Sequence, residues 1–217
     1  GGDTSSSTKG LLISVTVTGE ALAEEIVYRN GAREGDLICV TGDLGGAYTG
    51  LLLLEREKQV FKVNPEMQPE MTGHDYVLER QLKPEARTDI RNLLIGLNIH
   101  PTSMIDISDG LASEILHICK QSGKGCKIYE EKIPIVAETR QLAIEFNIAP
   151  TVCALNGGED YELLFTIPQS DYEKVKELSG ISIIGHITRP EDDKILITSD
   201  GQVMEITAQG WNALRDQ

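Results

Sequence analysis

The stretch that decides the fold is Ser-Met-Ile-Asp-Ile-Ser-Asp-Gly-Leu, residues 103–111. Residues 103–107 predict a short strand, and apolar side chains at Leu111, Ile115 and Ile118 predict a helix directly after it, because they share one helical face. Two carboxylates and a hydroxyl therefore lie between the end of a strand and the beginning of a helix.

Helices and strands alternate on both sides of this unit. Strands are predicted at 36–41, 127–133, 161–167 and 181–188, with a hairpin over 195–206, and helices at 47–57, 74–81, 85–97, 136–146 and 170–178, the last capped by Ser170. Mixed alternation of this kind favours an α+β fold, a layered α/β sandwich with a mixed, partly antiparallel sheet.

The N-terminal residues predict a strand that has no partner nearby. Residues 11–18 alternate apolar and polar side chains, which is the pattern of a half-buried strand, and one strand cannot fold alone. We therefore expect 1–19 to hold the last strand of a truncated N-terminal domain, 20–30 to connect, and 31–217 to form a C-terminal α/β domain.

Charge and composition exclude several classes of partner. The 217 residues carry a formal net charge of −14, so neither a nucleic acid nor an acidic membrane surface is an expected partner. No apolar run approaches the roughly 20 residues that cross a bilayer. The four cysteines form no C-x-x-C pair, which is typical of reduced cysteines in a cytoplasmic protein. A phosphorylated substrate would need bound cations to approach such an acidic chain.

The 106–110 loop permits two interpretations. Asp106 and Asp109 offer oxygen ligands to magnesium, and the amides of the following helical turn suit phosphate oxygens. Alternatively, Ser108 or Asp109 simply caps the helix, and the motif taken alone favours this second interpretation.

Residues 156–162, Asn-Gly-Gly-Glu-Asp-Tyr-Glu, form a second acidic cluster before a predicted strand. They suit either close approach to a ligand or an ordinary tight turn with solvated carboxylates. The glycine-rich turns at 1–4 and 42–46 could hold phosphate, but a packing role is favoured for the second. Neither matches a P-loop or a dinucleotide-binding fingerprint.

The ordered set of segments resembles the thiamine-monophosphate kinase family, which is related to aminoimidazole ribonucleotide and selenophosphate synthetases. The set comprises Gly-Gly-Asp-Thr at 1–4, 28–36, 104–111, 157–163 and Gly210-Trp211. The resemblance implies an ATP- and Mg²⁺-dependent enzyme that phosphorylates thiamine monophosphate to thiamine diphosphate. It also implies a homodimer formed by an N-terminal domain, most of which this chain lacks.

Residue roles follow from the same resemblance. The resemblance assigns Gly2 and Asp3 to the ATP and metal motif, Arg29 and Ser108 to ATP contacts, Asp106 and Asp109 to metal binding and catalysis, and Glu159 and Trp211 to substrate contacts. Because upstream aspartates of the family's metal cluster are absent, the chain alone is expected to be inactive. The alternatives are another ATP-dependent synthetase of the superfamily, of the selenophosphate or purine type, and a non-catalytic nucleotide-binding domain.

Joining two phosphates brings one anion up to another, so catalysis depends on positioning and on cations that neutralise charge. Clustered carboxylates in an acidic protein are consistent with magnesium binding. The single tryptophan, Trp211, could stack on a cationic thiazolium or a pyrimidine ring, or else could cover the core.

Overall fold

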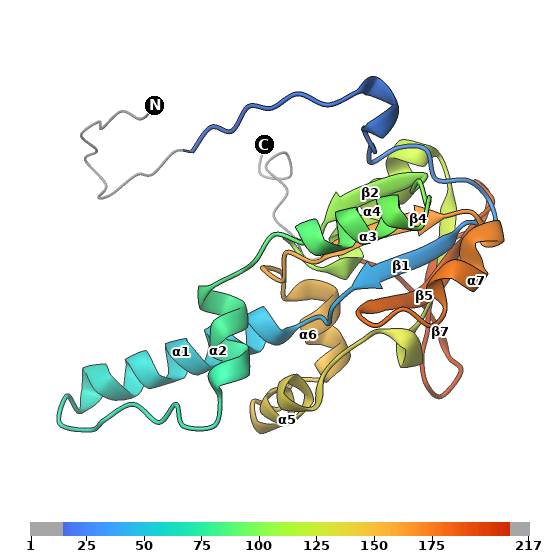
Figure 1. The fold of residues 1–217 in the computed structure, drawn as a ribbon. Coiled ribbons are helices and arrows are strands. Elements are labelled where there is room, and N and C mark those ends of the chain that lie inside the picture. The colour runs from blue at the N-terminus through green and yellow to red at the C-terminus, as the bar shows by residue number, and fades with distance from the viewer. Residues whose placement is uncertain (1–14, 209–217) are drawn as a thin grey trace, which may run out of the picture.

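The computed structural model describes residues 15–208 and places a seven-stranded mixed sheet at the centre of the protein (Figure 1). The strands lie in the order β2-β4-β1-β5-β3-β6-β7. Paired strands are antiparallel except for β3 and β6, which run parallel. The strands are β1 (Leu37–Thr41), β2 (Ser103–Asp106), β3 (Gly125–Tyr129), β4 (Leu163–Ile167), β5 (Ile181–Thr188), β6 (Lys194–Ile197) and β7 (Val203–Glu205).

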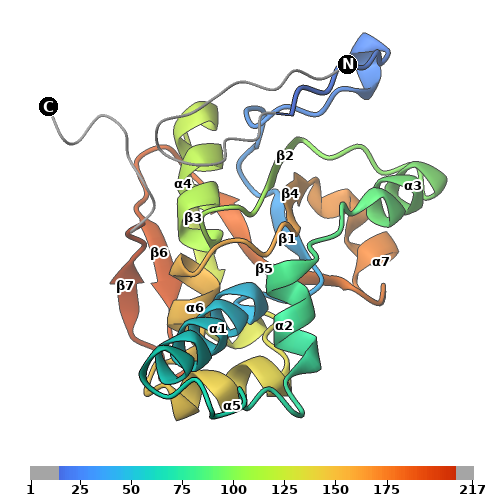
Figure 2. The ribbon, with the colours of Figure 1, turned by 90° about the vertical axis from the view of Figure 1, so that its left-hand side faces the viewer.

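Helices cover both faces of this sheet. They are α1 (Gly46–Val63), α2 (Asp75–Leu82), α3 (Thr88–Gly96), α4 (Leu111–Ser122), α5 (Ala137–Glu145), α6 (Pro150–Asn156) and α7 (Tyr172–Val175), with 3-10 turns at Ala23–Glu25, Glu130–Lys132 and Gln169–Asp171. Figure 2 shows α4 on one side of the sheet and α3 and α7 on the other. The sheet is therefore the middle layer of a sandwich.

The central strand β1 shows why both faces are covered. Ile38 and Val40 pack with α4 residues in one core cluster, and Cys39 between them packs with α3 residues in another. All three are fully buried, because successive side chains of a strand point to opposite faces. The predicted α+β class and mixed sheet are confirmed.

The long helix α1 and its neighbour α2 extend beyond one end of the sheet, where they meet α5 (Figures 1 and 2). A third, small cluster joins these helices through Leu53, Val77 and Leu142. Gly50 permits the close contact, since a Cβ there would lie 2.1 Å from the Val77 carbonyl oxygen. This packing brings α2 against the loop that precedes α1.

Several predicted elements change in extent. The strand predicted over 127–133 ends at Tyr129 and gives way to the turn Glu130–Lys132, and α6 was not predicted. The helix predicted over 170–178 is reduced to α7, without a side-chain cap from Ser170. Residues 15–18 of the predicted N-terminal strand are not in a strand, because no described segment pairs with them. Residues 11–14 lie outside the described part.

Among residues 15–208, no helix is both long enough and apolar enough to span a membrane.

Candidate functional site

The antiparallel pairing of β2 with β4 brings the two acidic segments together. Asp106 at the end of β2 lies opposite Leu163 at the start of β4. The loop that leaves β2 and the loop that enters β4 therefore meet at the same end of the sheet. We call them loop 106–110 and loop 157–162.

Backbone hydrogen bonds lock these two loops to each other. The Glu159 amide donates to the Ser108 carbonyl at 2.8 Å, and the Tyr161 amide donates to the Ile107 carbonyl at 2.9 Å. Gly158 has a φ of +70°, and a Cβ there would lie 2.5 Å from the Ser108 carbonyl oxygen. Only glycine satisfies both the left-handed backbone and this approach.

The beginning of α4 corrects one expectation. The N-cap residue is Gly110, and no side chain caps the helix, so neither Ser108 nor Asp109 has the capping role that the motif alone favoured. Gly110 has a φ of +109°, and a Cβ there would lie 2.5 Å from the carbonyl oxygen of Leu155 in α6. The Asp109 side chain is left exposed to solvent.

Three carboxylates of the two loops are exposed and share one electrostatic environment. Asp106, Asp109 and Glu159 are exposed, and no ion pair joins them to a basic side chain within residues 15–208. The Tyr161 hydroxyl donates to Glu159 Oε2 at 3.1 Å. The pKa of Tyr161 is raised, chiefly by this hydrogen bond. Burial and the negative charges of Glu159, Asp106 and Asp109 are smaller causes of the same rise in pKa. A cation or a cationic ring would relieve this concentration of charge.

Arg29 lies in a pocket that also includes Asp106. The pocket has a volume of about 630 Å³, and Tyr28 and Gln121 contribute to its wall. The Met104 amide donates to the Tyr28 carbonyl at 2.9 Å, which holds this segment against β2. The fold thus brings together two residues that are 77 positions apart in the sequence.

The remaining expected site residues, Gly2, Asp3 and Trp211, lie outside the described residues. Within 15–208, no group of three or more metal-ligating side chains is gathered. Asp106 and Asp109 are hard oxygen donors of the kind that magnesium prefers. They fit as part of a magnesium site that needs further ligands.

Glu114 is a buried carboxylate beside loop 106–110 that the sequence analysis did not single out. It lies in the first turn of α4, is 2% exposed, and its Oε1 accepts a 3.3 Å hydrogen bond from the Asp109 amide. Its Oε2 is buried without a partner among the described residues, and burial raises its pKa to about 7. The sequence signal that could have identified Glu114 is its position on the same helical face as Leu111 and Ile118.

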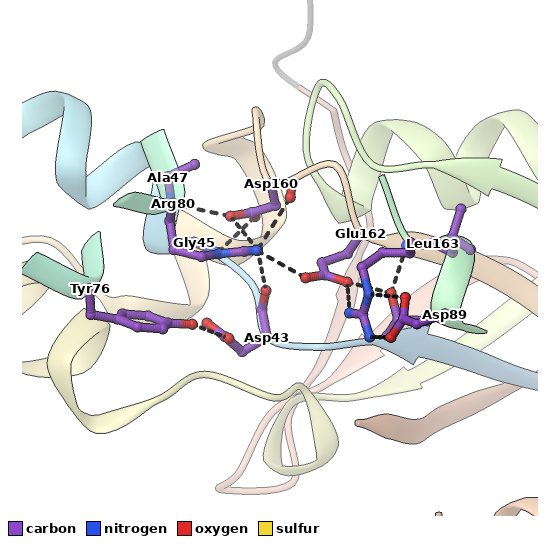
Figure 3. A network of polar contacts seen from close by, with 11 residues as sticks. Asp43, Gly45, Ala47, Tyr76, Arg80, Asp89, Asp160, Glu162 and Leu163 are labelled. Carbon is purple, nitrogen blue, oxygen red and sulfur yellow. Dashed lines mark hydrogen bonds and ion pairs between the residues drawn. The ribbon is translucent and has the colours of Figure 1, made fainter. Parts of the chain in front are cut away.

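The other two carboxylates of loop 157–162 are buried rather than solvated, and Figure 3 shows their polar contacts. Asp160 accepts hydrogen bonds from the amides of Gly45 at 2.7 Å and Ala47 at 3.2 Å, at the start of α1. The Gly45 amide of the 42–46 turn and the Ala47 amide of α1 are therefore occupied by a protein side chain. Because Gly45 also packs closely on Cys153 and Ala154, the packing role favoured for this turn is confirmed.

Glu162 binds two arginines that the sequence analysis did not single out. Its Oε1 is 3.0 Å from Arg80 Nη1 and its Oε2 is 2.5 Å from Arg87 Nη1, while Thr41 Oγ1 donates to the same Oε2 at 2.5 Å. The arginines line a pocket of about 540 Å³ in which acidic side chains outnumber basic ones. Both arginines are already paired with carboxylates, Arg80 with Glu162 and Arg87 with Glu162 and Asp89.

Comparisons with known proteins agree with this geometry. Residues 33–198 match the family described as AIR synthase related protein, C-terminal domain. The thiamine-monophosphate kinase of Bacillus subtilis (strain 168) is 31% identical over 217 residues, covering 98% of this chain and 63% of that protein.

Solved structures share the fold. One described as AaThiL complexed with AMPPCP and TMP superposes with a TM-score of 0.68 and 30% identity, covering 85% of this chain and 53% of that one. The hydrogenase maturation protein HypE in complex with ATP gives a TM-score of 0.65 at 18% identity, covering 91% and 57%, which shows a common fold alone. The chain thus spans between half and two thirds of these matched proteins.

Proposed function

The chain belongs to the family of AIR synthase related protein C-terminal domains, and on this premise we propose that it forms part of a thiamine-monophosphate kinase. The proposed reaction transfers the γ-phosphoryl group of ATP to the phosphate of thiamine monophosphate, giving thiamine diphosphate and ADP. The names of the relatives support this assignment.

One structural observation carries the proposal. Loop 106–110 and loop 157–162 are held together by the Glu159 and Tyr161 amides, so their exposed carboxylates form one acidic surface. Arg29 shares a pocket with Asp106 and adds a cation at the border of this surface. Carboxylates suit cations and a cationic thiazolium, and a guanidinium suits the phosphates of ATP.

The proposed division of labour follows the chemistry of each group. Asp106 and Asp109 supply two ligands to magnesium, which when bound neutralises the charge of the two phosphates. Asp3 adds a further ligand to this set, and Gly2, Arg29 and Ser108 contact ATP. Glu159 contacts the substrate, and Trp211 stacks on the thiamine rings. No general base is required, because the accepting phosphate is already ionised at neutral pH.

Isothermal titration tests the proposal. Wild-type protein with magnesium and a non-hydrolysable ATP analogue should bind thiamine monophosphate, and Glu159→Gln should weaken that binding by about tenfold or more. Glu177→Gln, which removes an exposed charge from another part of the surface, is the control and should bind normally.

The outcomes separate the alternative functions. Binding of a purine ribonucleotide or selenide in place of thiamine monophosphate would transfer the assignment to another synthetase of the superfamily. Binding of the ATP analogue alone would indicate a nucleotide-binding domain without this catalytic role.

We further propose that the 217-residue chain does not turn over by itself and that the enzyme acts as a homodimer. The first part rests on the resemblance to the kinase family, whose metal cluster contains aspartates besides those that match Asp3, Asp106 and Asp109. Formation of thiamine diphosphate by the purified chain, with contaminating kinase excluded, would contradict it. Sedimentation of the full-length enzyme tests the second part.

A further inference from the structure

Loop 157–162 has a strained backbone at the residues that face the site. Glu159 has a φ of +64° and Tyr161 a φ of +52°, and both are non-glycine residues in the left-handed region. Such conformations are costly for residues with a Cβ and persist where the surrounding structure holds them in place. The contacts that hold this backbone therefore determine the direction in which Glu159 points.

Arg80 makes those contacts from α2. Its Nη2 donates to the Asp160 carbonyl at 3.2 Å, and this carbonyl belongs to the peptide that joins Asp160 to the strained Tyr161. Its Nη1 donates to Glu162 Oε1 at 3.0 Å, one residue further along. Arg80 therefore holds the loop by its backbone and by a side chain at once (Figure 3).

The position of Arg80 is itself fixed. Its Nη2 also donates to the Asp43 carbonyl at 3.1 Å, and its side chain is 18% exposed. A guanidinium presents several donors in one rigid plane, so it can bind these three acceptors together, whereas a lysine ammonium cannot reproduce the arrangement. Arg80 does not line the pocket that contains Arg29 and Asp106, and its three hydrogen-bond acceptors all belong to this chain.

We propose that Arg80 is a positioning residue, which holds the strained backbone of Glu159 and Tyr161 against loop 106–110 and thereby sets the affinity for the phosphorylated substrate. The second half of this statement rests on the proposed function; the first half does not. Arg80 acts through Asp160 and Glu162 and is not itself a catalytic residue.

Arg87 provides a matched control. It also binds Glu162, through Nη1 and Oε2, and its side chain is 19% exposed, almost the same as that of Arg80. Its side chain also binds Asp89, and among the described residues it makes no hydrogen bond to the backbone of loop 157–162. Arg80→Lys and Arg87→Lys therefore each weaken an ion pair with Glu162. Only Arg80→Lys also removes the hydrogen bond to the Asp160 carbonyl.

Amide hydrogen exchange, followed by nuclear magnetic resonance, measures the positioning directly. The Glu159 and Tyr161 amides report on loop docking because they donate to Ser108 and Ile107, and the Ile187 amide, bonded to Asp36, serves as a reference. In Arg80→Lys the two loop amides should exchange at least about tenfold faster relative to the reference, and in Arg87→Lys much less so. Equal acceleration in both variants, or none in Arg80→Lys, would overturn the proposal.

Substrate binding then tests the link to function. With magnesium and the ATP analogue present, Arg80→Lys should lower thiamine monophosphate affinity by about tenfold while leaving affinity for the analogue nearly unchanged. Normal affinity despite faster loop exchange would overturn the second half of the proposal. If the wild-type protein binds no thiamine monophosphate, the proposed function fails, and the exchange measurement still decides whether Arg80 positions the loop.

Discussion

The two acidic loops differ in what their carboxylates contact. In loop 106–110, Asp106 and Asp109 are exposed and form no ion pair with a basic side chain of the described residues. Loop 157–162 holds carboxylates of both kinds: Glu159 faces solvent, whereas Asp160 and Glu162 are each 2% exposed and bind protein donors.

This difference separates charges available to a ligand from charges that maintain the fold. A buried carboxylate must be matched by donors, since desolvation is otherwise costly, and its partners then fix its position. An exposed carboxylate costs little and remains free to bind a cation. Neighbouring residues of one short loop therefore have opposite tasks.

The sharpest test compares Glu162→Ala with Glu159→Ala. Removing Glu162 leaves Arg80 and Arg87 without their shared partner, so we expect the free energy of unfolding to fall by about 3–5 kcal/mol. Glu159→Ala should change it by no more than about 0.5 kcal/mol. Urea unfolding measures both, and similar losses in the two variants would remove the distinction between the two carboxylates.

Asp106→Asn and Asp109→Asn test the exposed charges of the first loop. In the full-length enzyme, each should lower turnover on the order of a hundredfold, about 2.7 kcal/mol, because a metal contact is lost. The free energy of unfolding should stay within about 0.5 kcal/mol of wild type, since both side chains are exposed. Near-normal rates at saturating magnesium would exclude these residues as metal ligands.

The contact between the loops can be broken without changing any charge. Gly158→Ala places a Cβ against the Ser108 carbonyl, whereas Gly123→Ala, at a similar φ of +62°, meets nothing within 4 Å. We expect Gly158→Ala to cost roughly 1–3 kcal/mol more in unfolding free energy than Gly123→Ala. Equal costs would mean that backbone conformation alone, and not loop docking, requires glycine at this position.

A pH series sharpens the contrast for Asp160. Burial raises its pKa to about 6, against the opposing influence of the Gly45 amide, Arg80 and the Ala47 amide. The folded state therefore binds more protons than the unfolded chain between about pH 4 and pH 6, and the contribution of Asp160 to stability falls as the pH rises through this window.

We define this contribution as the unfolding free energy of wild type minus that of Asp160→Asn. The difference should fall by on the order of 1–3 kcal/mol between pH 4 and pH 7. Denaturant titrations at several pH values give this difference. A difference that is constant or grows with pH would contradict the raised pKa.

The smallest expected effect concerns Trp211, the single tryptophan of the chain, which lies outside the described residues. Trp211→Ala should weaken thiamine monophosphate binding by roughly 0.5–2 kcal/mol and leave ATP affinity nearly unchanged, with partial recovery by phenylalanine. Saturable quenching of its fluorescence by the substrate, but not by inorganic phosphate, is the accompanying signal. A lower melting temperature with an unchanged Michaelis constant would instead assign Trp211 to the core.

Local spacing was sufficient for most of the fold. The strand at 181–188 was predicted with its observed bounds, and the helix after Gly110 follows from apolar residues three and four positions apart. The helix Pro150–Asn156 was missed because it is short, and its buried residues Cys153 and Ala154 give only a weak periodic signal.

Of the candidate site, the sequence by itself determined which carboxylates follow β2 and precede β4, because those positions depend on local patterns. Tertiary structure decided which of them remain free. Glu162 meets Arg80 and Arg87 across 82 and 75 positions of sequence, and Thr41 across 121. Burial and pairing arise from contacts between distant segments, so neighbouring acidic residues that look equivalent in the sequence acquire different roles only when the chain folds.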